Sequence, residues 1–352
     1  MKKNKFHFDE RILKDYYLAD YFVKTRTILE KQNPEAIVTM QFFQRTPNAT
    51  LAGIEVVLDL LDFACKNFDD LEIWALPDGS TIDALEPVLR ITGHYQDFGF
   101  LEGMIDGILS RMTSVATNSA KILQAARGKK VLNMNDRADI YLNQGFDGLA
   151  SYLGGMLHFV SPAALEFIDD LRVEKPSGTM PHALIQAFNG DLIAALNAFE
   201  KTYPQSPLVA LVDYNNDCIT DALNCAKAFK NRLKFVRIDT AKNLTDKSLQ
   251  DLNLQKNNGD LTGVNITLVK KLRFELDRAG FSDVKIIVSS GFDANKITEF
   301  ENERAPVDVY GVGEAITKPT CSFTGDSVLL NHQKQAKFGR EYFESQRLKR
   351  IN

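Results

Sequence analysis

Leu208-Val-Ala-Leu-Val-Asp-Tyr214 is an apolar run with the length of a buried β-strand, and a helical pattern at 217–230 follows it directly. Three further strands are expected at 234–239, 284–290 and 307–313. They alternate with two further helices, expected at 264–279 and from 294 onward. Apolar strands that alternate with helices are typical of a parallel sheet covered by helices. The sequence therefore predicts an α/β fold whose larger domain is an incomplete or irregular (β/α) barrel.

The first part of the chain has a different pattern. Helices are expected at 9–31, 52–66 and 98–126, and strands at 37–43, 72–76 and 86–93. The aromatic residues of the first helix are spaced for buried faces, and the third helix is expected to break near Arg111. We predict a smaller α+β sandwich domain at residues 1–112, joined by the C-terminal segment 328–352, and a barrel domain at 113–327. The basic run Arg347-Leu-Lys-Arg350 is expected to be solvated.

Polar residues and glycines follow the strands of the predicted barrel at the points where these strands end. They are Asp213, Arg237 with Asp239, Ser290-Gly291, and Gly311 with Gly313. A barrel gathers the carboxyl ends of its strands on one face, where barrel enzymes keep their active sites. An arginine in an apolar strand needs a carboxylate partner, which is either a neighbour such as Asp239 or a ligand. Glycines at strand ends are most often turns, but their backbone N–H groups can also bind phosphate.

Gly178-Thr-Met-Pro-His-Ala183 opens a further helical pattern. Thr179 is a natural N-cap and Pro181 suits the first turn, so His182 is expected beside the free backbone N–H groups of a helix start. That position favours a neutral, nucleophilic imidazole and provides a local anion site. A capped helix whose histidine only faces a loop remains the simpler interpretation of these residues alone.

Composition excludes several classes of protein. The net charge is −4 without a basic half, which gives a nucleic-acid partner little support. No apolar run approaches the ~18–20 residues of a membrane span, and no apolar region follows the basic start as in a signal peptide. The four cysteines are scattered, which indicates reduced thiols in a cytoplasmic protein rather than a disulfide framework or a zinc site.

Several strings resemble the nicotinate phosphoribosyltransferases, which have a type II phosphoribosyltransferase fold. The resemblance runs from about Tyr16 to Arg340 and is strongest at Gly178–Ala183, 235–240 and 284–313. It implies transfer of the phosphoribosyl group of phosphoribosyl pyrophosphate to nicotinate, coupled to ATP hydrolysis through a phosphohistidine at His182. It further implies a homodimer in which one subunit lends its first domain to the other's site.

The resemblance also assigns roles to other positions. Tyr21 would stack on the pyridine ring, Arg237 would bind the nicotinate carboxylate, and Thr179, Arg137 and Asp239 would contact substrate. The phosphate-binding residues would be Ser290, Gly291, Gly311, Gly313 and Glu314. Magnesium is expected as a cofactor, with Asp213 and Asp239 as candidate ligands and Asp139 as a third, although capping or ion pairing is the commoner role of any one aspartate.

Two positions depart from the family pattern. Asp136 stands where relatives carry the first of two adjacent arginines, and Glu314 stands where many have a small hydroxyl residue. A carboxylate facing a phosphate would be repelled, so the side chain of Glu314 either turns away or impairs the site. Two alternatives therefore stay open: a phosphoribosyltransferase that uses quinolinate or nicotinamide, and a non-catalytic descendant that only binds nucleotide or a partner.

Overall fold

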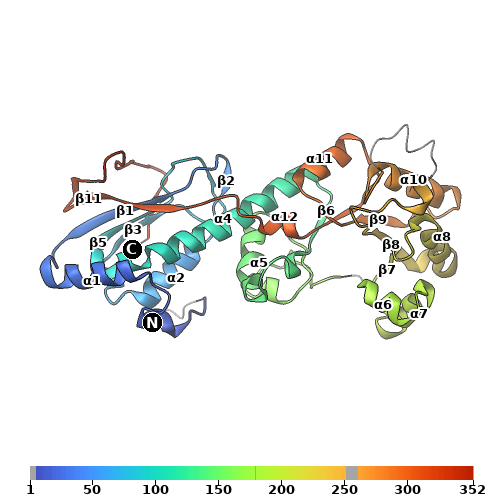
Figure 1. Cartoon of the computed structure of the whole chain (residues 1–352), viewed down its shortest axis with the longest axis horizontal. Helices are drawn as coiled ribbons and strands as arrows, with labels where there is room; N and C mark the ends of the chain where they lie inside the picture. Colours follow the sequence, from blue (N-terminus) through green and yellow to red (C-terminus); the bar gives the residue numbers. More distant parts are fainter. Residues whose placement is uncertain (1–4, 179, 251–260, 352) are drawn as a thin grey trace.

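A computed structural model describes residues 5–178, 180–250 and 261–351 of the chain. The molecule is elongated, and both chain ends lie in the same half (Figure 1). That half holds an antiparallel sheet, and the other half holds a parallel sheet.

Four of the five strands of the parallel sheet, β7 to β10, are among those that the sequence predicts. Its order is β6 (Lys130–Asn133), β10 (Val309–Val312), β9 (Lys285–Val288), β8 (Leu233–Ile238) and β7 (Leu208–Leu211). All four strand pairs are parallel, with Leu211 opposite Arg237 and Arg237 opposite Ile287. The predicted α/β class is therefore confirmed. Among the described residues β6 and β7 are the edge strands and do not pair with each other, so the barrel is open.

Three helices connect consecutive strands of the parallel sheet, and each begins at a polar N-cap. They are α8 (Cys218–Phe229), α10 (Ile266–Arg278) and α11 (Ala294–Asn302), capped by the side chains of Asp217, Asn265 and Asp293. Each cap accepts a hydrogen bond from a backbone N–H of the first turn, which satisfies a group that has no partner inside the helix. The apolar faces of these helices share one hydrophobic core with the sheet.

The antiparallel sheet joins segments from both ends of the chain. Its order is β12 (Gln333–Lys334), β11 (Thr324–Leu330), β1 (Ile37–Phe43), β5 (Leu89–His94), β3 (Glu72–Ala75) and β13 (Lys349–Arg350). The basic side chains of the run 347–350 are exposed, as expected for a solvated segment, but Lys349–Arg350 pair with β3 and Leu348 is buried. The sequence did not reveal this strand pairing, because the single apolar residue that enters the core stands among charged residues. The domain limits themselves remain a prediction.

Helix α4 (Glu102–Ala125) runs from one half of the molecule to the other (Figure 1). The predicted break near Arg111 is absent, and the helix is continuous through that residue. At this residue the helix passes from one hydrophobic core to the other. Ile105 and Leu109 pack with the antiparallel sheet, whereas Met112 and Val115 pack with the parallel sheet. A single rigid helix therefore connects the two cores.

The predicted first helix at 9–31 is divided in the structure. A 3₁₀ helix at Glu10–Lys14 ends at Asp15, whose φ of 63° is left-handed, and α1 (Asp20–Gln32) follows. The expected burial of its aromatic face is also wrong, since Tyr16, Tyr17, Tyr21 and Ile28 are exposed and only Phe22 of that set is buried. Tyr16 and Tyr17 pack edge to face against each other and beneath the guanidinium of Arg11, which gives them partners outside the core.

The remaining elements complete the two halves. They are β2 (Ala49–Thr50) paired with β4 (Thr81–Ile82), and the helices α2 (Ile54–Ala64), α3 (Tyr95–Phe98), α5 (Gln144–Leu153), α6 (His182–Ala187), α7 (Leu192–Thr202) and α12 (Glu314–Thr317). All four cysteines are buried free thiols, as expected. Within the described ranges, no helix is both long enough and apolar enough to cross a bilayer.

Candidate active site

Most of the predicted site residues lie along one edge of the parallel sheet, where its strands end. Asp213 follows β7, Arg237 and Asp239 flank the end of β8, Ser290 and Gly291 follow β9, and β10 leads from Gly311 to Gly313. Because adjacent parallel strands end at the same edge, residues far apart in sequence become neighbours. The structure thus collects one histidine, one arginine, two aspartates and two glycine-containing turns at this edge.

His182 is the first residue of α6 and contacts the end of β7. Its Nε2 atom lies 3.1 Å from both carboxylate oxygens of Asp213, and its ring stacks on Tyr214 at a centroid distance of 6.5 Å. The N-cap of α6 is Pro181, without a side-chain cap, so the helix begins later than predicted. Thr179, the predicted N-cap, lies outside the described residues.

Asp213 is the buried partner of this pair, with 8% of its side chain exposed, whereas 43% of His182 is exposed. Burial raises the pKa of the Asp213 carboxyl group, and the contact with His182 opposes that rise. The nearby Asp239 also raises the pKa of Asp213, which means that the two carboxylates are close enough to repel each other. The exposed imidazole is therefore anchored through one nitrogen to a buried carboxyl group.

Arg237 is held by side chains from its own strand and from β9. Its Nε donates to Ser289 Oγ at 2.9 Å, and Nη2 donates to Asp239 Oδ2 at 3.1 Å. Ser289 Oγ in turn donates to Asp239 Oδ1 at 2.7 Å. Only 15% of the Arg237 side chain is exposed. This closed triangle orients the plane of the guanidinium group at the edge of the sheet.

The two glycine-containing segments depend on glycine for different reasons: backbone conformation at the first and close contact with a neighbouring segment at the second. Ser290 and Gly291 have φ values of 74° and 68°, and two left-handed residues in succession turn the chain sharply. A methyl group added at Gly311 would lie 2.8 Å from Met134 Sδ, and one at Gly313 would lie 2.7 Å from Met134 O. Only glycine therefore allows the segment after β6 to pack against the end of β10.

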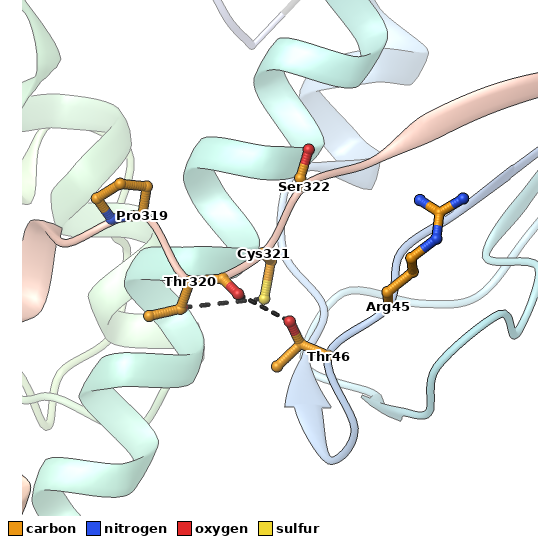
Figure 2. A pocket seen from close by; sticks show the side chains of 6 residues that line it. All are labelled: Arg45, Thr46, Pro319, Thr320, Cys321 and Ser322. Atoms are coloured by element: carbon orange, nitrogen blue, oxygen red, sulfur yellow. Dashed lines mark hydrogen bonds between the residues drawn. The ribbon is translucent and has the colours of Figure 1, made fainter.

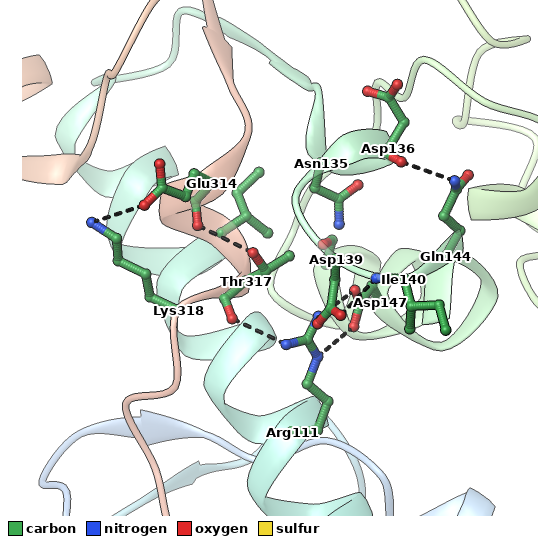
Figure 3. Close-up of polar contacts among 12 residues, drawn as sticks. Arg111, Asn135, Asp136, Asp139, Ile140, Gln144, Asp147, Glu314, Thr317 and Lys318 are labelled. Carbon is green, nitrogen blue, oxygen red and sulfur yellow. Dashed lines mark hydrogen bonds and ion pairs between the residues drawn. The ribbon is translucent and has the colours of Figure 1, made fainter. Parts of the chain in front are cut away.

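The two departures from the family pattern, Glu314 and Asp136, both have exposed side chains. The carboxylate of Glu314 is 84% exposed and lies 4.0 Å from Lys318 Nζ (Figure 3). Asp136 and Arg137 are exposed residues of a short 3₁₀ helix at Asn135–Arg137. In Figure 3 the Asp136 side chain points away from the Arg111 cluster below it. The phosphate-binding role of Glu314 stays a prediction, and its carboxylate faces solvent and a lysine, the orientation in which its side chain turns away.

Asp139 joins a different ion-pair cluster. Its Oδ2 lies 2.7 Å from Arg111 Nη2, and Arg111 also makes a bidentate pair with Asp147 at 2.9 and 2.6 Å (Figure 3). Arg111 Nη1 donates to the backbone oxygen of Thr317. The cluster ties α4 to α5 and to the end of α12, so Asp139 has a structural ion pair and is not grouped with Asp213 and Asp239.

Tyr21 is not brought to this edge within one chain. It lies on α1 beside the antiparallel sheet, its side chain is exposed, and its ring packs against Phe22 at 4.4 Å between centroids. An exposed tyrosine with one open face is available to another molecule.

Two cavities lie elsewhere, and no predicted site residue lines them. One, of about 320 Å³, is lined by Arg45, Thr46 and Pro319–Ser322 between the end of β1 and the segment that enters β11 (Figure 2). The Thr46 hydroxyl donates to Thr320 O there, which closes its floor. The other, of about 300 Å³, lies between the N-terminal segment and helices α2, α4 and α5, with Arg111 and Asp147 in its wall.

The described residues contain no group of three or more histidine, cysteine or acidic side chains arranged to hold a metal. Asp213 and Asp239 are nevertheless two neighbouring carboxylates at the edge. Magnesium commonly binds one or two protein carboxylates and keeps several waters, so this pair fits that ion.

Two lysines beside these turns were missed by the sequence analysis. Lys242 lies in the polar segment after β8, and Lys296 in the first turn of α11. The signal for Lys242 was its position directly after Asp239-Thr-Ala at a strand end. Nothing in the local pattern marked Lys296, whose helical spacing is that of an ordinary surface residue.

The sequence of this chain is similar to those of known phosphoribosyltransferases. Residues 21–113 match the family model described as quinolinate phosphoribosyl transferase, N-terminal domain. The chain is 28% identical over 252 residues to a nicotinate phosphoribosyltransferase of Mycobacterium tuberculosis and 27% identical over 241 residues to that of Bacillus subtilis. These alignments cover 69% and 68% of the chain but 47% and 44% of the relatives, so the chain spans about half their length.

Solved structures extend the similarity over nearly the whole chain. A nicotinate-nucleotide pyrophosphorylase from Pyrococcus furiosus is 30% identical, with a TM-score of 0.80 over 97% of this chain and 82% of that one. The human nicotinic acid phosphoribosyltransferase shares the fold, with a TM-score of 0.67 at 18% identity over 92% of this chain and 77% of that one.

Proposed function

Because the chain belongs to the nicotinate phosphoribosyltransferase family of type II phosphoribosyltransferases, we propose that it transfers the phosphoribosyl group of phosphoribosyl pyrophosphate to nicotinate. The products are nicotinate mononucleotide and pyrophosphate, a step of NAD biosynthesis. The pyridine nitrogen attacks the ribose carbon, and the bond to pyrophosphate breaks. Pyrophosphate is a good leaving group, so the protein's contribution is to position the reactants and stabilise charge.

The observation that carries this proposal is the geometry of Arg237. Its guanidinium is oriented by Ser289 and Asp239 at the edge of the sheet, as a site for one carboxylate requires. A planar guanidinium binds a carboxylate through two parallel hydrogen bonds, which also fixes the direction of the attached ring. In this arrangement the nicotinate nitrogen would be aimed along the edge of the sheet toward the turns after β9 and β10.

The neighbouring carboxylates suit a magnesium-bound substrate. Asp213 and Asp239 would hold the ion, directly or through water, and the ion would neutralise charge on the leaving pyrophosphate. The backbone of Ser290, Gly291, Gly311 and Gly313 would bind the ribose 5-phosphate. The exposed position of Glu314, beside Lys318, removes the repulsion that its carboxylate would otherwise impose.

We assign the coupling to ATP to His182. With Nε2 facing the Asp213 carboxyl group, Nδ1 is the nitrogen open to a phosphoryl group. Transfer forms a bond from Nδ1 to the terminal phosphorus of ATP and breaks the bond to ADP. The Asp213 carboxylate accepts from Nε2–H, which stabilises the positive charge that develops on the ring.

The place of Tyr21 supports a homodimer as part of this proposal. The base-stacking tyrosine is exposed on α1, away from the edge of its own parallel sheet. In the proposed assembly each subunit supplies Tyr21 to the site of its partner, where the aromatic face stacks on the pyridine ring.

Quinolinate is the second candidate base, and the matching N-terminal family model favours it. Quinolinate carries two carboxylates and calls for a second cation beside Arg237. Arg237 is a single cation whose plane Ser289 and Asp239 fix, which suits the single carboxylate of nicotinate.

The direct test is product formation. Purified protein with nicotinate, phosphoribosyl pyrophosphate and magnesium should yield nicotinate mononucleotide on chromatography, and omission of either substrate should abolish it. ATP labelled in its terminal phosphate should mark the wild-type protein with an acid-labile phosphate, and His182→Ala should not be marked. Absence of any nucleotide product would favour a non-catalytic descendant, and a label that persists in His182→Ala would refute the phosphohistidine.

A further inference from the structure

Lys242 lies against the turn after β9, although it belongs to the segment after β8. A methyl group added at Gly291 would come within 2.3 Å of Lys242 Cε and 2.9 Å of its Nζ. The end of the lysine side chain therefore rests on the backbone of Gly291, in space that any other residue would fill. Neither the sequence patterns nor the family resemblance assigned a role to this contact.

The backbone that carries Lys242 is fixed in place. The turn 241–244 is closed by a hydrogen bond from Leu244 N to Ala241 O at 3.0 Å, and Gly263 N donates to Leu244 O at 2.7 Å. A methyl group at Gly263 would lie 3.2 Å from Lys242 Cα, so these two segments touch. An isolated β-bridge between Thr245 and Thr262 continues the contact. Lys242 is an exposed residue whose backbone these contacts hold near the site.

A second ammonium group lies beside the same turn, against the ring of Phe292, which directly follows Gly291. Lys296 projects from the first turn of α11, its Nζ lies 4.5 Å from the centre of the Phe292 ring, and it is partly buried. Burial lowers the pKa of Lys296, and the charge of Lys242 lowers it further, against smaller opposing effects of Glu299 and Asp293. Within the described ranges neither lysine has a carboxylate within 4.0 Å. Two ammonium groups at one turn, without an ion-pair partner among the described residues, favour the binding of an anion.

We propose that Lys242 and Lys296 form a phosphate-binding clamp over the Ser290–Gly291 turn and bind the 5-phosphate monoester of phosphoribosyl pyrophosphate. This assignment rests on the proposed function, because it names the residues that recognise one end of that substrate. The left-handed turn at Ser290 and Gly291 lies against Lys242, and the backbone N–H groups of such a turn can bind an anion. A phosphate dianion would satisfy both ammonium groups and relieve their mutual repulsion.

Equilibrium binding of ribose 5-phosphate, measured by calorimetry, tests the clamp without any turnover. Lys242→Met keeps the aliphatic stem on Gly291 and removes the charge, and it should weaken binding about 10- to 100-fold. Lys296→Met should weaken it in the same direction. The matched control is Lys247→Met, an exposed lysine five positions further along the same segment, which should bind like wild type.

The outcomes distinguish failure of the lysine clamp from failure of the proposed function. A selective loss in Lys242→Met supports the clamp, even if the wild-type protein makes no nucleotide from nicotinate. Unchanged binding in Lys242→Met overturns the clamp, even if the wild type is fully active. An equal loss in Lys247→Met also overturns it, since the effect would then be a general one of net charge.

Discussion

Arg237 and Glu102 show how single side chains acquire properties from their surroundings. Arg237 is an ordinary cation that becomes a directed binding group because Ser289 and Asp239 fix its plane. Glu102 is an ordinary carboxylic acid whose environment near Asp106 and Asp326 favours its protonated form. For each of these two residues, one substitution tests the property that we infer.

Arg237→Ala should weaken the use of nicotinate strongly. Loss of a charge-assisted bidentate contact typically costs ~2–4 kcal/mol, roughly 30- to 1,000-fold in kcat/KM for the base. The KM for phosphoribosyl pyrophosphate should change far less. Arg232→Ala, at an exposed pair with Glu200 just before β8, is the control and should resemble wild type. Equal losses for both substrates would show that Arg237 does not bind the nicotinate carboxylate.

Glu102→Gln should change how stability depends on pH. Burial, with repulsion from Asp106 and Asp326, raises the pKa of Glu102 from 4.5 to about 7. The folded protein therefore retains a proton that the unfolded chain loses, so this contribution to stability is complete below about pH 4.5 and is lost as pH rises through 7. Glutamine cannot ionise.

Urea denaturation of wild type and Glu102→Gln should accordingly give similar free energies of unfolding at pH 5. At pH 8 the variant should be the more stable by on the order of 1 kcal/mol, after allowance for partial exposure to solvent. Parallel pH profiles of the two proteins would mean that Glu102 ionises freely in the folded state.

At the scale of elements, α4 carries the connection between the two halves. It passes from one hydrophobic core to the other between Leu109 and Met112, next to Arg111. The sequence suggested a break there because a charged residue interrupts the apolar pattern. The structure neutralises that charge with Asp147, 36 positions later, and with Asp139. A local pattern cannot reveal an ion pair between distant segments.

Arg111→Met should destabilise the protein by about 3 kcal/mol, because it leaves the carboxylate of Asp147 buried without its cation. Only 3% of the Asp147 side chain is exposed. Adding Asp147→Asn should recover part of the loss, and Arg127→Met, at an exposed position after α4, should be nearly neutral. These values can be read from urea denaturation. A loss below ~1 kcal/mol in Arg111→Met would mean that the cluster does not tie α4 to α5.

The sequence predicted the parallel sheet well and the candidate site only in part. The strands of that sheet are apolar and local, so composition was enough to find them. The strand-end residues Asp213, Arg237 and Asp239 could be found for the same reason. The contact of His182 with Asp213 and the approach of Lys242 to Gly291 join separate segments, and only the folded chain brings them together. The exposure of Tyr21 was missed because helical spacing does not reveal which face has a partner.

At the scale of the whole molecule, the proposed site is incomplete in one chain. Tyr21 lies in one half of the elongated molecule, whereas Arg237 and His182 lie in the other (Figure 1). In a homodimer that shares sites, Tyr21→Ala and Arg237→Ala damage different halves of the same site. A mixed dimer therefore contains one site that carries both changes and one intact site.

Mixing the two inactive variants after subunit exchange should restore activity, up to about one quarter of that of wild type for random pairing. Mixing Arg237→Ala with His182→Ala, whose changes lie in the same half, should restore none of the ATP-coupled activity. Equal results for the two mixtures would mean that each chain builds its site alone.

The central claim is that this site uses the single carboxylate of nicotinate, and the specificity of turnover tests it most directly. kcat/KM should be measured for nicotinate, quinolinate and nicotinamide, each with saturating phosphoribosyl pyrophosphate and magnesium. The account predicts that nicotinate is preferred by at least about 100-fold, since quinolinate adds a second carboxylate beside Asp239 and nicotinamide offers Arg237 no charge. A preference for quinolinate with release of carbon dioxide, or equal use of nicotinamide, would contradict it.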